Sequence, residues 1–243
     1  MTDYISVRDL SSGLLKEYNE ALCNYKPQSC EYTYANLYSW QNSYDTKIAR
    51  LPDGSFSVLF TVDGEYSFLP PVKKDADMNV FAEEIKNFCK KNKKSSFYLG
   101  GFLESEVKCA EEFFGKGIFY PERGNFDYIY EVEPLCNFSG KKLHAKRNHL
   151  NRFLKMYDGR YEIKPLTKEL CMECKEFTDL WNDINAEYVH EGLEEEKQCA
   201  FTLLENIERF GLSGLCLYVD GKMVGYTIGE SSYPCSETLV VHI

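Results

Sequence analysis

The sequence lacks any long apolar run, and no stretch approaches the ~20 apolar residues that a transmembrane helix needs. Its first ten residues include Asp3, Arg8 and Asp9 and contain no apolar core of a secretion signal. We therefore expect a cytoplasmic protein without a membrane span. In that reducing compartment the ten cysteines should be free thiols, most of them buried as small apolar side chains.

Positive charge is also scarce, because the formal net charge is −10 at pH 7. This balance disfavours a general nucleic-acid coat, since phosphates are repelled at long range. One local exception is residues 141–160, which hold seven Lys or Arg and one acid. With 44% hydrophobic and 27% charged residues, the 243-residue chain has the composition of one large or two small globular domains.

Common catalytic and metal-binding patterns are missing as well. No spacing suggests a Ser-His-Asp arrangement, and the C-x-x-C formed by Cys171 and Cys174 has no second pair that would complete a metal site. Cys174 shares an apolar helix stripe with Trp181, so we expect both cysteines to pack in a core. His190 and Glu191 follow in a polar loop, where either could serve as a base in proton transfer. Nothing in the spacing pairs them with a nucleophile, so we expect ordinary surface residues.

The order of predicted elements suggests two similar units. Asp-Gly turns separate short strand-like runs in both halves of the chain, which is typical of antiparallel meanders. We read the order as an internal repeat with a boundary near Pro134, giving units 1–133 and 134–243. The first unit is predicted to contain helices over 9–25, 33–41, 78–93 and 104–114 and strands over 45–51, 55–62, 65–72, 95–99 and 126–132.

The second unit repeats the helices and the meander. Its last predicted strand runs to Ile243, so we expect this unit to be truncated at its C-terminus or completed by a partner chain. Helices are predicted over 141–157, 167–184 and 194–210, and strands over 161–163, 214–219, 223–230 and 238–243.

Several stretches resemble a known family. They are CEY and NLYSW at residues 30–32 and 36–40, FDYIY at 126–130, GKKLHAKRN with NRF across 140–153, and residues 219–229. Their order along the chain is similar to that of the C-terminal domain of phosphatidylglycerol lysyltransferases, in a stand-alone form. These enzymes are related to the Fem-type peptidyl transferases.

The resemblance implies an α/β (α+β) chain with two tandem GNAT-like (acyl-CoA N-acyltransferase) folds. It also implies an acyl- or aminoacyltransferase that moves an aminoacyl group from charged tRNA to a lipid or amine acceptor, so aminoacyl-tRNA or acyl-CoA is the expected donor. Two alternatives stay open. One is an acetyl-CoA-dependent N-acetyltransferase, which needs a pyrophosphate-binding loop at a helix N-terminus. The other is a non-catalytic binding protein that kept the scaffold.

The basic segment 141–160 supplies the candidate binding residues. Arg147 falls on the same helix stripe as Leu143 and Leu150, and a buried arginine needs a partner. It forms a structural salt bridge to an inward acid, or it buries its stem and keeps its charged end in water. The functional alternative is that it lines a cleft between the units, where its guanidinium would bind a phosphate or carboxylate. The second interpretation places the basic helix at the groove that the two units share.

Neighbouring residues extend this hypothesis. Lys142, Lys146 and His149 form an adjacent row that would contact phosphates of tRNA, an anionic lipid head group or another anionic small molecule. The alternative is a solvated helix face. Tyr128 precedes the junction of the units and would offer a phenol to the cleft, unless it simply packs as part of a strand.

Overall fold

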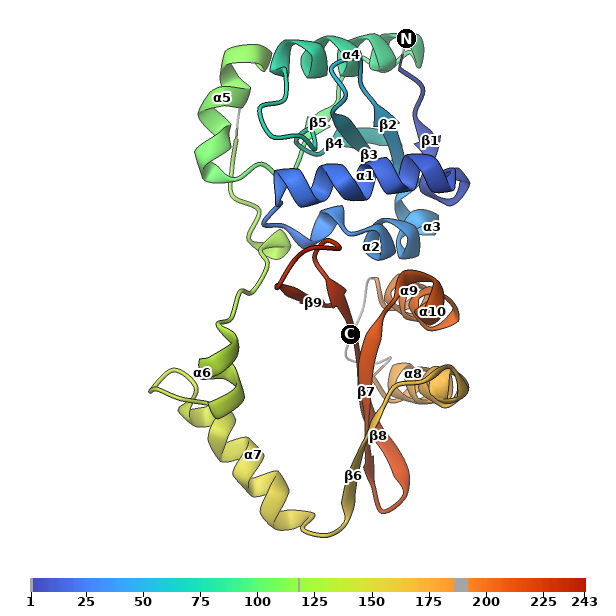
Figure 1. Cartoon of the computed structure of the whole chain (residues 1–243), viewed down its shortest axis with the longest axis vertical. Helices are drawn as coiled ribbons and strands as arrows, with labels where there is room; N and C mark the ends of the chain where they lie inside the picture. Colours follow the sequence, from blue (N-terminus) through green and yellow to red (C-terminus); the bar gives the residue numbers. More distant parts are fainter. Residues whose placement is uncertain (1, 118, 186–191) are drawn as a thin grey trace.

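A computed structural model describes residues 2–117, 119–185 and 192–243. These residues form a mixed α+β structure with two β-sheets, one from each half of the chain (Figure 1). The expected α+β class with two sheet-and-helix units is confirmed. The boundary between units 1–133 and 134–243 stays a prediction, and Pro134 lies inside helix α6 (Val132–Asn137).

The first unit is built on a five-stranded sheet in the order β1-β2-β3-β4-β5. Adjacent strands in this sheet are antiparallel, except for β4 and β5, which are parallel. The meander that the Asp-Gly turns predict is therefore present, with a short strand added at each edge. The strands are β1 (Ile5–Ser6), β2 (Lys47–Arg50), β3 (Phe56–Val62), β4 (Glu65–Phe68) and β5 (Tyr98–Leu99).

Helices cover both faces of this first sheet. Tyr18 of α1 packs in one buried cluster with Ile48 and Val58, while Phe81 of α4 packs in another with Leu59. Val58 and Leu59 are consecutive on β3 and so point to opposite faces, which makes the first unit a three-layer structure. Its helices are α1 (Ser12–Tyr25), α2 (Tyr34–Ser39), α3 (Gln41–Tyr44), α4 (Met78–Lys91) and α5 (Glu104–Phe114).

The second unit has a four-stranded antiparallel sheet in the order β6-β7-β8-β9. Helices α8 and α9 cover one face, where Cys174 and Leu203 pack against Cys216 and Ile228. The elements are β6 (Tyr161–Pro165), α8 (Cys171–Asn185), α9 (Leu193–Glu205), α10 (Ile207–Phe210), β7 (Ser213–Val219), β8 (Lys222–Ser231) and β9 (Leu239–Val241).

The two units meet where α2 lies against α9 and α10, a contact called the junction below. Ala35 of α2 is buried in the same cluster as Leu203 of α9, and the Cys199 thiol donates to the Ser39 hydroxyl at 3.1 Å. The Phe210 ring of α10 lies 5.1 Å from the Tyr38 ring. The junction is thus a packed apolar interface, and it fixes the second sheet beneath the first unit (Figure 1).

Residues 119–157 form a connecting arm between the units. The predicted strand over 126–132 is wrong, since residues 126–131 belong to no strand in the described structure and their side chains are exposed. The apolar alternation is present in the sequence, but no strand among the described residues pairs with it. Helices α6 and α7 (His144–Met156) follow, and Figure 1 shows them on the opposite side of the second sheet from α8 and α9. Within the described ranges, every helix is too short or too polar to cross a bilayer.

Candidate functional site

A histidine and a carboxylate meet at the end of the second sheet. The Nε2 atom of His242 lies 2.9 Å from Oε1 of Glu230, and the two side chains are only 7% and 13% exposed. Glu230 is on β8, and His242 follows β9 directly. Buried polar groups of this kind are normally hydrogen-bonded, and here each serves as the partner of the other.

The pair lies on the face of the sheet that carries the core of the second unit. Glu230 is two residues from the fully buried Ile228, so both side chains point to the same face. Ile228 belongs to the cluster against which Trp40 of the first unit packs. The next residues of the hairpin reach the first unit too, because Tyr233 packs on the cluster that contains Tyr18. The Glu230–His242 pair is therefore near the junction.

This arrangement can carry proton transfer. A carboxylate that accepts a hydrogen bond from one ring nitrogen orients an imidazole and selects its tautomer. With the proton on Nε2 of His242 directed at Glu230, the Nδ1 atom is the proton acceptor. Such a group is suited to act as a general base.

Just before α2, the carboxylate of Glu31 lies near that of Asp127, which is on the arm. The backbone N–H and the thiol of Cys30 both donate to the Asp127 carboxylate, each at 3.1 Å. Beside them Asn36 donates to Glu31 at 3.4 Å. Burial, and then the charge of Asp127, raise the pKa of Glu31, while burial and the Asp127 contact raise the pKa of the Cys30 thiol. Cys30 is therefore held as a thiol, a poor nucleophile, and Asp127 fastens the arm to the first unit.

Arg147 does not lie on a buried stripe, and this expectation is corrected. In the described chain α7 has no buried residue, and Arg147 is half-buried. Its guanidinium donates to the carbonyl of Phe138 at 2.8 Å and lies 3.1 Å from Nδ1 of His144. The partner is thus a backbone carbonyl at the α6 end, and the expected ion pair with an inward acid is absent from the described residues.

The remaining predicted residues are also on the arm and exposed. Lys142, Lys146 and His149 lie at or near the first turns of α7. Tyr128 is 74% exposed and accepts a 3.4 Å hydrogen bond from Arg123, whose guanidinium lies over its ring. Tyr128 is therefore not packed in a strand. All of these residues are on the arm. Tyr128 adjoins Asp127, which bonds to Cys30, whereas Figure 1 shows α7 away from α2, α9 and α10.

The two cysteines of the C-x-x-C are core residues, as predicted. Both are buried, and Cys174 Sγ lies 3.7 Å from Cys216 Sγ. Burial raises the pKa of Cys174 and of Cys171, so both are held as thiols. Among the residues described, no group of three His, Cys, Asp or Glu could hold a metal ion. His190 and Glu191 lie outside the described residues.

Sequence patterns missed the Glu230–His242 pair because both residues are inside predicted strands. The available signal was the hairpin itself. Pairing 223–230 with 238–243 as antiparallel neighbours brings the two stretches together. In the observed register Glu230 pairs with Val240, so His242 is a diagonal neighbour of Glu230.

The family model described as "Phosphatidylglycerol lysyltransferase, C-terminal" matches residues 24–243. A conserved protein of unknown function from Bacteroides thetaiotaomicron superposes with a TM-score of 0.83 and 28% identity, covering 95% of this chain and 76% of that chain. No curated protein matches the chain.

Two further solved structures align with lower scores. The C-terminal (DUF2156) domain of a putative lysylphosphatidylglycerol synthetase from Agrobacterium fabrum gives a TM-score of 0.47 at 13% identity, covering 88% of this chain and 64% of that one. A tandem GNAT protein from the clavulanic acid biosynthesis pathway gives 0.43 at 9% identity, covering 94% and 73%.

Proposed function

Because the chain belongs to the family of phosphatidylglycerol lysyltransferase C-terminal domains, we propose that it is an acyl- or aminoacyltransferase. The finer proposal is transfer of an aminoacyl group from charged tRNA to an amine or lipid acceptor. The proposed reaction class, acyl transfer, is supported by the family match over residues 24–243. The Glu230–His242 pair supports it, since it supplies a proton acceptor near the junction.

The proposed reaction is an acyl transfer. The acceptor nitrogen or oxygen attacks the ester carbonyl carbon, forming a new C–N or C–O bond, and the ester bond to the ribose oxygen breaks. His242 takes the proton from the acceptor and returns it to the leaving ribose oxygen, while Glu230 stabilises the intermediate imidazolium. The ester is already activated, so orientation of the two substrates supplies much of the remaining rate.

The arm is proposed to bind the anionic part of a substrate. Arg147 donates to the Phe138 carbonyl and contacts His144, and the N–H groups of its guanidinium that neither contact uses would bind a phosphate in this proposal. Lys146, Lys142 and His149 would add charge along the exposed face of α7. Tyr128, next to the Asp127 anchor of the arm, would offer its hydroxyl or ring to the same substrate.

The direct test is transfer of a labelled aminoacyl group from charged tRNA to a panel of lipid and amine acceptors, with acetyl-CoA as a separate donor. We expect H242Q and E230Q to lower the rate, H242Q by about 100-fold. E237Q, an exposed carboxylate in the same hairpin, is the matched control and should retain the rate. A thermal melt of each variant separates lost chemistry from lost folding.

The outcomes distinguish the alternatives. Transfer from acetyl-CoA alone would replace the aminoacyl proposal with N-acetylation. An absence of transfer from either donor across the panel would contradict the proposal and favour a binding protein on the same scaffold. A folded H242Q variant with wild-type rate would remove His242 from the mechanism while leaving the reaction class intact.

A further inference from the structure

The ten cysteines differ in how far solvent reaches them, and this separates inert thiols from reactive ones. All ten are free thiols, and half of them are buried. Cys174 and Cys216 have sulfurs 3.7 Å apart, but both lie in the core of the second unit, where an oxidant has no access. The buried cysteines are Cys89, Cys171, Cys174, Cys199 and Cys216.

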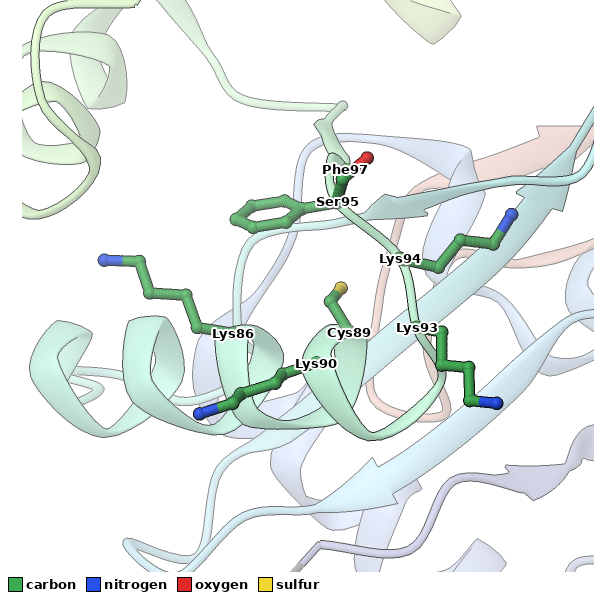
Figure 2. Close-up of a pocket in the computed structure, with 7 residues that line it drawn as sticks. All are labelled: Lys86, Cys89, Lys90, Lys93, Lys94, Ser95 and Phe97. Atoms are coloured by element: carbon green, nitrogen blue, oxygen red, sulfur yellow. The ribbon is translucent and has the colours of Figure 1, made fainter.

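Cys89 shows that nearby positive charge is not enough to make a thiol reactive. It lies among four lysines at a shallow pocket of about 380 Å³, formed by the end of α4 and the loop after it (Figure 2). Lys94 lowers the pKa of the Cys89 thiol, but burial is the larger effect and raises this pKa to about 11. Cys89 is therefore an inert thiol, and a reactive pair needs a cysteine that solvent reaches.

Cys23 and Cys235 are in contact although they belong to different units. Cys23 is half-buried on α1 of the first unit, and Cys235 is exposed in the turn between β8 and β9 of the second. The thiol and the backbone N–H of Cys235 both contact the sulfur of Cys23. Burial, and then the Cys235 thiol, raise the pKa of the Cys23 thiol. Cys23 is therefore held in its protonated form beside an accessible second thiol.

The turn that carries Cys235 has a defined backbone. The Ser236 N–H donates to the Tyr233 carbonyl at 2.9 Å, which closes a four-residue β-turn. Pro234 occupies the second position of this turn, where the fixed φ of proline is favoured. Cys235 is the third residue, so its side chain is presented from a backbone that local contacts already order.

Packing of this turn on the first unit places Cys235 independently of the sulfur contact. Tyr233 packs against the buried cluster that contains Leu22, the residue before Cys23. Figure 1 shows the turn between β8 and β9 reaching the first unit beneath α1. The approach of the two cysteines therefore follows from how the units are packed. The same hairpin carries the Glu230–His242 pair, so a bond at Cys235 would fix the strands on which that pair lies.

We propose that Cys23 and Cys235 form a reversible disulfide between the two units when a hydroperoxide oxidises the exposed thiol. The Cys235 sulfur attacks one peroxide oxygen, so that an S–O bond forms, the O–O bond breaks and a sulfenic acid results. The Cys23 sulfur then attacks the sulfenic sulfur, so that the S–S bond forms and the hydroxyl leaves as water with the Cys23 proton. Hydrogen peroxide takes two electrons and two protons from the pair and becomes two water molecules.

The environments of the two cysteines assign these roles. Cys235 reacts first because solvent reaches it, whereas Cys23 stays protonated and resolves the sulfenic acid that forms in contact with it. A dithiol reductant returns both residues to thiols by exchange. The reaction needs neither an acyl donor nor an acceptor, so the inference is independent of the proposed function.

The main experiment is peptide mapping of the full chain after treatment with hydrogen peroxide and blocking of the remaining thiols with iodoacetamide. The tryptic peptide 223–243 contains Cys235 as its only cysteine, and fragmentation of the joined peptide distinguishes Cys23 from Cys30. We expect a Cys23–Cys235 link that dithiothreitol removes. It should be absent from C23S and C235S and retained in the control C109S, which removes an exposed cysteine on α5.

Trapping with dimedone tests the order of the two steps. In C23S the sulfenic acid at Cys235 has no resolving thiol, so dimedone should label Cys235 heavily. In C235S, Cys23 should remain almost unlabelled. Labelling of Cys23 in C235S at the rate of Cys235 in C23S would overturn the assigned roles.

Thermal melts separate the disulfide from effects on folding. Under reducing conditions C23S and C235S should melt with the wild type, because each substitution changes one side chain by a single atom. Oxidation should raise the melting temperature of the wild type by about 5 to 10 °C, since the link constrains the unfolded chain, and should leave that of C235S unchanged. The inference is overturned if no link forms, or if Cys235 pairs equally with several cysteines in the folded chain.

Discussion

The junction and the arm contain similar residue types but differ in how they are packed. At the junction, aromatic and small apolar residues of α2 meet α9 and α10, and Ala35 and Leu203 are buried in one cluster. On the arm, α7 has an apolar stripe of the same period, yet in the described structure none of its residues is buried. Periodicity therefore predicted both helices, but it could not predict which apolar stripe has a partner.

The contrast between the junction and the arm also concerns charge. Arg209 at the junction donates to the Tyr38 hydroxyl at 3.1 Å and stacks on its ring, so its position is fixed by both units. In the part of the chain that the structure describes, Arg147 is held by two residues of the arm itself, Phe138 and His144. An arginine that contacts both units, such as Arg209, is suited to stabilise the junction. An arginine on an exposed arm, such as Arg147, is suited to bind a ligand.

The largest expected effect tests packing directly. Leu203→Ala on α9 leaves a cavity in the cluster that joins the units, so it should lower the free energy of unfolding by about 2 to 5 kcal/mol. Leu150→Ala on α7 should change it by less than about 0.5 kcal/mol, since that side chain is already exposed. Urea denaturation of both variants measures the difference. Equal losses would show that the arm is packed against the rest of the chain in solution.

The second-largest expected loss of stability concerns the aromatic contact between α10 and α2. The Phe210 ring packs against the rings of Tyr34 and Tyr38, at 5.6 and 5.1 Å, and is half-buried. Phe210→Ala should therefore cost about 1 to 3 kcal/mol, less than a fully buried phenylalanine. Phe210→Leu, which keeps most of the apolar contact, should recover about half of that loss. Thermal unfolding in two separate transitions for Phe210→Ala would indicate that the units had uncoupled.

Local signals predicted the elements well, and long-range pairing explains what they missed. The turns Asp63-Gly64 and Asp220-Gly221 have positive φ at both positions, as two-residue hairpins require, so the meanders were readable from the sequence. The run from Phe126 to Val132 alternates like a strand but has no neighbour to pair with in the described structure. A strand depends on a second segment that its own sequence does not specify.

The residues of the candidate site were also predicted where they are close in sequence and missed where long-range pairing brings them together. Arg147 and its neighbours were readable because they are consecutive in one basic helix. Glu230 and His242 are separated along the chain and meet only through the register of β8 and β9. Residues that act across a hairpin become visible once the hairpin is paired, and neither residue is unusual in its local context.

A smaller effect concerns Glu31, which lies between the first unit and the arm. Its pKa is raised above 4.5 by burial and by Asp127, so the folded state binds the proton more tightly than the unfolded state. The resulting stability is present at low pH and is lost as pH rises through the folded pKa. The free energy of unfolding of Glu31→Gln should therefore increase relative to that of the wild type as the pH rises from about 4 to about 7, by up to about 1 kcal/mol. Urea denaturation at both pH values measures it, and a larger gain at pH 4 would contradict the assignment.

The smallest expected change in stability is for Arg147→Ala. The side chain is partly exposed and bonds a carbonyl at the end of α6, so its removal should alter the free energy of unfolding by no more than about 0.5 kcal/mol. Hydrogen exchange of α7 amides should increase, because the hairpin of α6 and α7 loses its fixed link. Arg147→Lys keeps the positive charge but loses the forked geometry of the guanidinium. Compared with Arg147→Ala, we expect it to recover salt-dependent anion binding more than the protection of the α7 amides. A stability loss above about 2 kcal/mol would place Arg147 among the packed residues of the junction type and would remove the distinction between the two regions.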